Sequence, residues 1–181
     1  MPFLPSLPDP AHLRDLYARF PQNVRPLMDY TDGLLRGAGE LSVGERELIA
    51  TYVSALNACT FCTGAHRAYA EVFGIAPALI DALIEDAETA PVDERLRPLL
   101  AYVAKLNSLP SRLVQADARA VYEAVQVCAL FNMMNRIIEG TGVNFDYAQA
   151  PEGHPAAGTT PEDQAASYSR FGEMIAAKIM G

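Results

Sequence analysis

The sequence predicts an all-α protein, and three observations support this. Apolar residues recur at helical spacing along most of the chain, for example at Leu48, Ile49, Tyr52, Val53 and Leu56. Sequence signals for helix ends bound such stretches: residues 42–45 have a capping-box pattern, and Gly74 suits a left-handed C-terminal stop. No stretch of useful length alternates apolar and polar residues as a half-buried strand does.

These signals predict the helices in order. The first ten residues carry four prolines and are expected to form an extended arm. Asp9 is expected to cap a short helix that has Pro10 at its first position and ends at Pro21. Pro98 lies about one turn into the helix predicted at 93–107, which therefore starts later or kinks there. The other helices are expected at residues 24–35, 42–57, 59–73, 77–84, 114–139 and 161–180.

We expect one helical core with an arm at each end. Residues 1–23 form a Pro-rich arm and short helix, residues 24–142 the core, and residues 143–181 an irregular segment followed by a helix. A chain of 181 residues is long enough for one domain with a sizeable core. Because the arms have little to fold against alone, we expect them to be exchanged between subunits.

Composition and charge exclude several classes of protein. Hydrophobic residues make up 50% and charged residues 20% of the chain, which fits neither a disordered chain nor a coiled coil. The net charge of -8 opposes contact with phosphate backbones, so no nucleic-acid partner is expected. Three cysteines are too few for a secreted disulfide framework, and no signal peptide or membrane span is recognisable. The expectation is a soluble cytoplasmic protein with no membrane partner.

The candidate chemistry lies in Cys59, Cys62 and His66, with Glu47 twelve positions before Cys59. Since a helix advances about 100° per residue, the two cysteines and the histidine share one helix face. Side chains three residues apart are neighbours, so Cys59 and Cys62 can close a disulfide. Where thiols are kept reduced, such a pair is more often redox-active or metal-binding than structural.

A thiol pair at a helix start needs a proton donor to attack a peroxide quickly. Lowering a thiol pKa from about 8.5 to about 6.5 raises the thiolate fraction roughly 25-fold, but the loss of nucleophilicity removes roughly six- to tenfold of that. The net gain is only a few-fold. His66, oriented by Glu47, can supply the proton that the departing hydroxide or alkoxide needs.

The spacing of Glu47, Cys59, Cys62 and His66 is E-x11-C-x2-C-x3-H. In this pattern the chain resembles the alkylhydroperoxidase D-like group of the carboxymuconolactone decarboxylase superfamily. Residues 131–136 are similar to a helix of its uncharacterised peroxidase-related branch, and the helical resemblance covers residues 27–142. The resemblance implies an all-α alkylhydroperoxidase D-like bundle that oligomerises, commonly as trimers or hexamers, with no metal or other cofactor. It also implies a thiol-dependent peroxidase for hydrogen peroxide or small organic hydroperoxides.

The resemblance further implies a role for each residue of the pattern. Cys62 attacks the peroxide and becomes a sulfenic acid, Cys59 condenses with it to a disulfide, and His66 and Glu47 form the proton relay. A dithiol protein, thioredoxin-like or lipoyl-bearing, then acts as the reductant. The helix dipole by itself favours Cys59 as the attacker, so the order of the two cysteines stays open. Phe61 departs from the pattern, because the best-studied members carry a second histidine there.

Other interpretations of the same residues remain. The protein could be a lyase like the decarboxylase of the superfamily, or a non-catalytic module whose disulfide alters assembly. It could also hold zinc through Cys59, Cys62 and His66, with a fourth ligand from Glu47, His12 or His154.

The remaining polar and thiol side chains are expected to be structural. Cys128 is expected to be a buried core thiol. His12 and His154 are expected to be exposed, and Asn135 and Arg136 to stabilise the helix that carries them.

Overall fold

The computed structural model describes residues 2–108 and 117–180, with side chains up to residue 177, and this part of the chain is helical without any strand. The all-α prediction is confirmed. The first three residues of the helix predicted at 114–139 lie outside the described residues. The helices are α1 (Leu13–Arg19), α2 (Val24–Arg36), α3 (Val43–Leu56), α4 (Thr60–Val72), α5 (Pro77–Glu85), α6 (Arg97–Ser108), α7 (Ala118–Thr141) and α8 (Ser167–Met180), with a 3-10 turn η1 (Pro151–Gly153).

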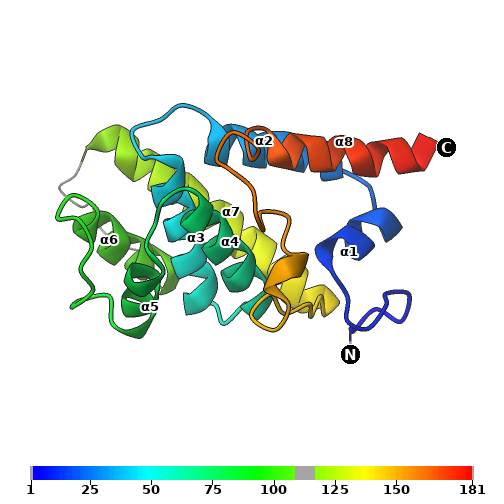
Figure 1. Cartoon of the computed structure of the whole chain (residues 1–181), viewed down its shortest axis with the longest axis horizontal. Coiled ribbons are helices and arrows are strands. Elements are labelled where there is room, and N and C mark those ends of the chain that lie inside the picture. Colours follow the sequence, from blue (N-terminus) through cyan, green and yellow to red (C-terminus); the bar gives the residue numbers. More distant parts are fainter. Residues whose placement is uncertain (1, 109–116, 181) are drawn as a thin grey trace.

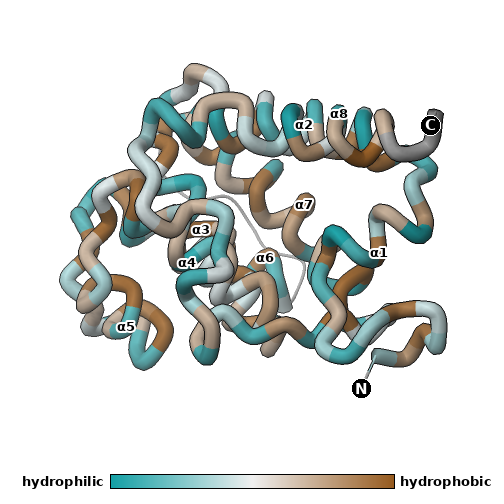
Figure 2. Tube along the Cα trace, turned by 45° about the vertical axis from the view of Figure 1, so that its right-hand side comes forward, coloured by the Kyte–Doolittle hydropathy of each residue, from teal (hydrophilic) through white to brown (hydrophobic). Residues whose placement is uncertain are grey.

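Helices α3, α4 and α7 form the centre of the molecule. α3 and α4 pack along each other, α7 lies against α3, and α5 and α6 pack beside them. α2 and α8, which come from opposite ends of the chain, lie side by side across the top of Figure 1. Figure 2 shows the hydrophobic residues of α7 running through the middle of the molecule. None of the helices in the described residues is long and apolar enough to cross a membrane.

Most helix starts follow the local sequence signals. The capping box of α3 forms as predicted: the Glu45 N–H donates to Ser42 Oγ at 3.2 Å, and the Ser42 N–H donates to Glu45 Oε2 at 2.7 Å. The turn between α3 and α4 contains Ala58 in the left-handed region, with φ 55°, which brings Cys59 to the N-cap of α4. α6 starts at Arg97, so Pro98 lies in its first turn, where a missing N–H breaks no helical hydrogen bond.

The prediction for α1 is wrong in its start. His12, not Asp9, is the N-cap, and the His12 N–H donates to Asp15 Oδ2 at 3.0 Å. Asp9 instead accepts a hydrogen bond from Asn144 Nδ2 at 2.9 Å. A contact between segments far apart in the sequence therefore replaces the expected local cap.

The prediction for α8 is also wrong in its start, which is Ser167 and not Pro161. The Thr160 N–H donates to Asp163 Oδ2 at 2.9 Å, and the Asp163 N–H donates to Thr160 Oγ1 at 3.3 Å. This local pairing forms a turn, and Ala166 at φ 53° ends it before the helix begins. Because of this turn, α8 begins later along the chain than predicted.

Both arms pack against the core of their own chain. The Ala11 N–H donates to Asn144 Oδ1 at 2.7 Å, and the N–H groups of Asn144 and Phe145 both donate to the Ala11 carbonyl at 3.0 Å. These bonds join the N-terminal arm to the segment that follows α7. The two segments together cover the start of α4, where the candidate site lies.

Candidate active site

Three of the four pattern residues belong to the start of α4, and the fourth reaches them from α3. Cys59 is the N-cap of α4, Cys62 lies in its first turn and His66 one turn further on. Glu47 projects from α3 and is fully buried, with 0% of its surface exposed. The structure therefore brings Glu47 against His66, as the spacing leads one to expect.

An apolar cavity of about 150 Å³ opens beside the start of α4. A void of this size in a protein interior accommodates about one benzene ring. Cys62 and His66 line it, whereas Cys59 is completely buried behind them. All three cysteines are free thiols. The aromatic side chains that line the cavity are Phe61, Tyr69, Phe131, Tyr147, Tyr168 and Phe171.

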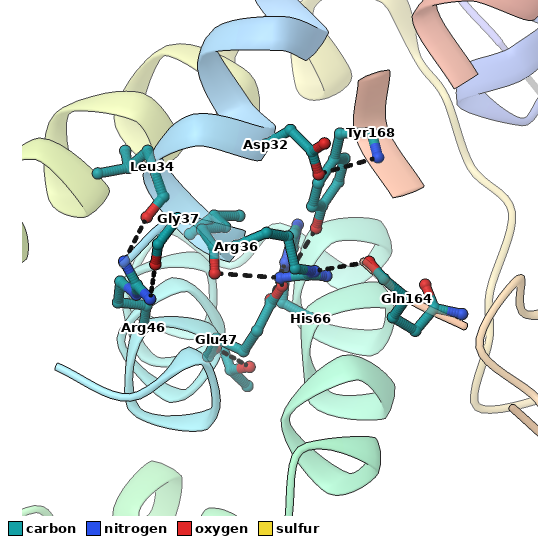
Figure 3. Close-up of polar contacts among 11 residues, drawn as sticks. Asp32, Leu34, Arg36, Gly37, Arg46, Glu47, His66, Gln164 and Tyr168 are labelled. Atoms are coloured by element: carbon teal, nitrogen blue, oxygen red, sulfur yellow. Dashed lines mark hydrogen bonds and ion pairs between the residues drawn. The ribbon is translucent and has the colours of Figure 1, made fainter. Parts of the chain in front are cut away.

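A buried chain of charged groups leads away from His66. The distance between His66 Nδ1 and Glu47 Oε2 is 2.6 Å, and the other carboxylate oxygen, Oε1, forms an ion pair with Arg36 (Figure 3). The Tyr168 hydroxyl also donates to Glu47 Oε1, at 3.3 Å. Because Glu47 accepts at Nδ1, His66 carries its hydrogen there, and its Nε2 atom is available to exchange protons.

Glu47 is an ionised carboxylate inside the protein core. Burial alone raises its pKa, but the charges and hydrogen bonds of His66 and Arg36 outweigh this, so the pKa of Glu47 is lowered overall. This carboxylate, bonded at Nδ1, fixes the orientation and the tautomer of the imidazole beside it. The pair is thus suited to hold a proton during a reaction at the cavity.

Arg36 and Tyr168 belong to this site but were not predicted from the sequence. The guanidinium lies over the rings of Tyr69, Phe73 and Tyr168, at 4.8–5.2 Å from their centroids, and Arg36 Nε donates to the Gln164 carbonyl at 3.3 Å. No local pattern marks either residue, because α2 and α8 meet Glu47 only through tertiary packing. A buried arginine at the end of α2 has no sequence signal of its own.

The Cys62 thiol has a raised pKa in this reduced state. A hydrogen bond with Cys59 is the largest cause, and burial adds to it, whereas a hydrogen bond from Asn135 lowers the pKa. The Asn135 amide is fixed in orientation: its Oδ1 accepts from Asn57 Nδ2 at 2.9 Å, and its Nδ2 donates to Ser54 Oγ at 3.2 Å. Asn135 is therefore structural, as expected, and also borders the thiol.

The prediction that His12 and His154 are exposed is wrong. His154 is buried, with 5% of its surface exposed, and both histidines line the cavity because the arms fold over α4. Burial is the main reason that the pKa of each is lowered to about 4, so both are neutral near pH 7. The Nδ1 atoms of both rings accept backbone N–H groups, from Arg14 at 3.1 Å and from Ala156 at 2.9 Å.

Cys128 is a buried thiol, as expected. It lies in α7, outside the cavity lining, with its sulfur 3.5 Å from Asn132 Nδ2. Arg136 is exposed on α7. No group of three metal-binding side chains is found among the described residues.

The fold and the site together define a helical protein with a dithiol beside a buried histidine–carboxylate pair. Residues 21–105 match the model of the carboxymuconolactone decarboxylase family. The resemblance inferred from the sequence is confirmed.

Two solved structures are similar to the chain over most of its length. One is an uncharacterised peroxidase-related protein from Silicibacter sp. TM1040, with a TM-score of 0.65 and 27% identity, which covers 72% of this chain and 73% of that one. The other, from Ralstonia eutropha JMP134, is described as an alkylhydroperoxidase AhpD core and an uncharacterised peroxidase-related protein. Its TM-score is 0.64 at 26% identity, and the match covers 72% of this chain and 74% of that one. No curated protein matches the chain. The fold is alkylhydroperoxidase D-like.

Proposed function

We propose that the protein is a thiol-dependent peroxidase that reduces hydrogen peroxide or small organic hydroperoxides. One observation carries this proposal: Cys62 and His66 line the same apolar cavity, and the Nδ1 atom of that histidine is held by the buried Glu47 carboxylate. A nucleophile, a base and a group that orients the base are the parts that thiol chemistry needs.

In the proposed reaction, Cys62 transfers its proton to His66 Nε2 and its sulfur attacks the terminal oxygen of the peroxide. The O–O bond breaks, Cys62 becomes a sulfenic acid, and His66 returns the proton to the departing hydroxide or alkoxide. Proton transfer by a positioned histidine contributes about 100- to 10,000-fold to a rate. The Glu47 carboxylate stabilises the imidazolium that forms between these two steps.

Cys59 is the proposed resolving thiol. It lies within hydrogen-bond contact of Cys62 and is completely buried, so it faces the other thiol and not the cavity. Condensation of the Cys59 thiol with the Cys62 sulfenic acid forms a disulfide and releases water. A dithiol protein, thioredoxin-like or lipoyl-bearing, then reduces this disulfide, and we expect the protein to act as a homo-oligomer.

The lyase alternative fits the cavity less well. The superfamily decarboxylase acts on a γ-lactone acid, which is an anion, and a site for an anion requires a compensating positive charge. Neither Lys nor Arg is among the described residues that line the cavity. Its apolar walls suit an uncharged peroxide.

The first experiment counts free thiols in reduced protein before and after one equivalent of cumene hydroperoxide. We expect wild type to lose two thiols, and a sulfenic acid to be trapped only in Cys59→Ser, with no reaction in Cys62→Ser. Repeated turnover with excess peroxide and dithiothreitol separates an enzyme from a module that is oxidised once. Wild-type thiols that survive minutes of exposure would rule out the peroxidase.

A further inference from the structure

His12 and Tyr147 meet at the wall of the cavity, although one precedes α1 and the other follows α7. A short hydrogen bond joins His12 Nε2 to the Tyr147 hydroxyl. Both side chains line the cavity together with Cys62 and His66. Neither belongs to residues 21–105, the part of the chain that matches the family model. The two arms thus bring a polar pair to a cavity whose thiol and relay belong to the core.

The direction of this hydrogen bond follows from the other ring nitrogen of His12. Since Nδ1 accepts the Arg14 N–H at 3.1 Å, the neutral imidazole carries its hydrogen on Nε2. Nε2–H therefore donates to the Tyr147 oxygen, and the phenol hydrogen is left to donate elsewhere. Burial is the main reason that the pKa of Tyr147 is raised above its usual value near 10, so the phenol keeps its hydrogen.

Packing against α4 fixes the position of the pair. Phe61, which directly precedes Cys62, contacts the rings of both His12 and Tyr147, each with a centroid distance of 5.3 Å. At Gly64 a Cβ atom would lie 3.2 Å from the Cβ of Tyr147, so the absence of a side chain lets Tyr147 approach the helix closely. The Tyr147 side chain is therefore held beside the turn that carries the reactive thiol.

We propose that the Tyr147 hydroxyl donates a hydrogen bond to the oxygen that leaves when Cys62 attacks an organic hydroperoxide, and that His12 positions this hydroxyl. The inference rests on the proposed function. As the Cys62 sulfur bonds to the terminal oxygen, the electrons of the O–O bond pass to the other oxygen, which becomes an alkoxide. His66 protonates the alkoxide to an alcohol, so Tyr147 undergoes no net proton transfer. A donor already in place stabilises the negative charge as it develops.

The test uses Tyr147→Phe, which removes one oxygen atom, in the Cys59→Ser background, where the first oxidation step is isolated. Oxidation of Cys62 is followed by acid quench and mass spectrometry, with cumene hydroperoxide and with peracetic acid. Alkylation of Cys62 by iodoacetamide is the matched reaction, because it uses the same thiolate but has no peroxide oxygen as leaving group. Tyr122→Phe, at a tyrosine with 64% of its surface exposed, is the control variant.

We expect Tyr147→Phe to slow oxidation by cumene hydroperoxide roughly 100-fold and to leave alkylation unchanged. The effect with peracetic acid should be much smaller, because its leaving carboxylate needs less stabilisation. His12→Ala should show the same pattern, and His12→Gln, which retains an N–H donor, should keep more of the rate.

Each other outcome overturns the inference in a distinguishable way. Equal losses in oxidation and alkylation would mean that Tyr147 only maintains the structure, and an unchanged oxidation rate would exclude it from the reaction. Both results would leave the proposed peroxidase intact. No oxidation of Cys62 in the parent protein by either peroxide would overturn the proposed function, and this inference with it.

Discussion

Glu47 is the residue whose charge links the site to the stability of the whole chain. It is completely buried and ion-paired to Arg36, so the neutral variant Glu47→Gln leaves an unpaired buried guanidinium. Removing one partner of a buried ion pair costs about 3–5 kcal/mol. At pH 7 we therefore expect a large loss in the free energy of unfolding, measured by urea denaturation and circular dichroism.

The loss of stability in Glu47→Gln should depend on pH, and the lowered pKa of Glu47 gives the direction of this dependence. The pKa of Glu47 in the folded protein is lowered from 4.5, so its stabilising contribution is present above pH 4.5 and is lost as the pH falls through the folded-state pKa. The difference in stability between wild type and Glu47→Gln should therefore shrink below pH 4.5. Asp81→Asn is the control, because this carboxylate also has a lowered pKa but is fully exposed. A difference that stays constant from pH 7 to pH 3 would contradict the assignment.

At the residue scale, the sequence predicts the local part of the site well and the distant part poorly. Cys59, Cys62 and His66 lie within two turns of one helix, so their spacing alone puts them together. Arg36 and Tyr168 reach Glu47 from α2 and α8, and the register between those helices depends on packing that no local pattern encodes. The prediction that His12 and His154 are exposed is wrong for the same reason, because the arms that carry them fold over α4 through tertiary packing.

Among the elements, the pair α2 and α8 depends on one glycine. At Gly172 a Cβ atom would lie 2.9 Å from the Cβ of Met28 and 3.3 Å from the Cα of Arg25, both in α2. Gly172→Ala gains about 1 kcal/mol in helix propensity, but it forces the two helices apart, which costs about 1–3 kcal/mol. We expect a lower melting temperature, because the contact is with the backbone and Cβ of α2 and these atoms have little freedom to move.

Gly33→Ala, in α2, is the matched control for this prediction. A Cβ atom at Gly33 has no neighbour within 4 Å, so only the propensity term applies, and the melting temperature should rise. Thermal unfolding of the two variants next to wild type is the measurement. If Gly172→Ala were as stabilising as Gly33→Ala, α8 would not be held against α2 as the structure has it.

Some helix starts are predicted correctly from the sequence, whereas others depend on contacts or turns that the sequence signals do not reveal. The capping box at Ser42 involves only neighbouring residues, and the start of α3 is predicted correctly. The starts of α1 and α8 are wrong because Asp9 bonds to Asn144 and because residues 160–163 prefer a turn. Positive φ at Ala166 adds to the second error, since alanine carries no signal for a left-handed conformation.

For the whole molecule, the arms are the part that the sequence described least well. They were expected to have little to fold against within one chain, yet Leu7 and Ala11 are buried against their own core. The two arms also pack against each other, because the N-terminal arm is hydrogen-bonded to the segment after α7. Exchange of arms between subunits stays a prediction, and sedimentation at micromolar concentration, where a monomer would exclude it, is the measurement that checks it.

The Asn144 side chain hydrogen-bonds these two segments to each other, so its substitution tests whether the arms affect the reaction at the site. Its side chain accepts the Ala11 N–H at 2.7 Å and donates to Asp9 at 2.9 Å. Asn144→Ala removes both bonds, at about 0.5–1.5 kcal/mol each. We expect local opening of the N-terminal arm, seen as faster amide hydrogen exchange in residues 2–12, with little change in α3 and α4.

Opening of the arm should also affect the oxidation of Cys62, because it moves His12 away from Tyr147. In Asn144→Ala, oxidation of Cys62 by cumene hydroperoxide should slow, while its alkylation by iodoacetamide should keep its wild-type rate or increase as the thiol becomes more accessible. Gln149→Ala is the control, since the Gln149 side chain donates to the nearby Asp146, at 2.9 Å, on an exposed surface. Faster exchange in the arm without any change in the oxidation rate would show that the arms cover the thiol site without taking part in it.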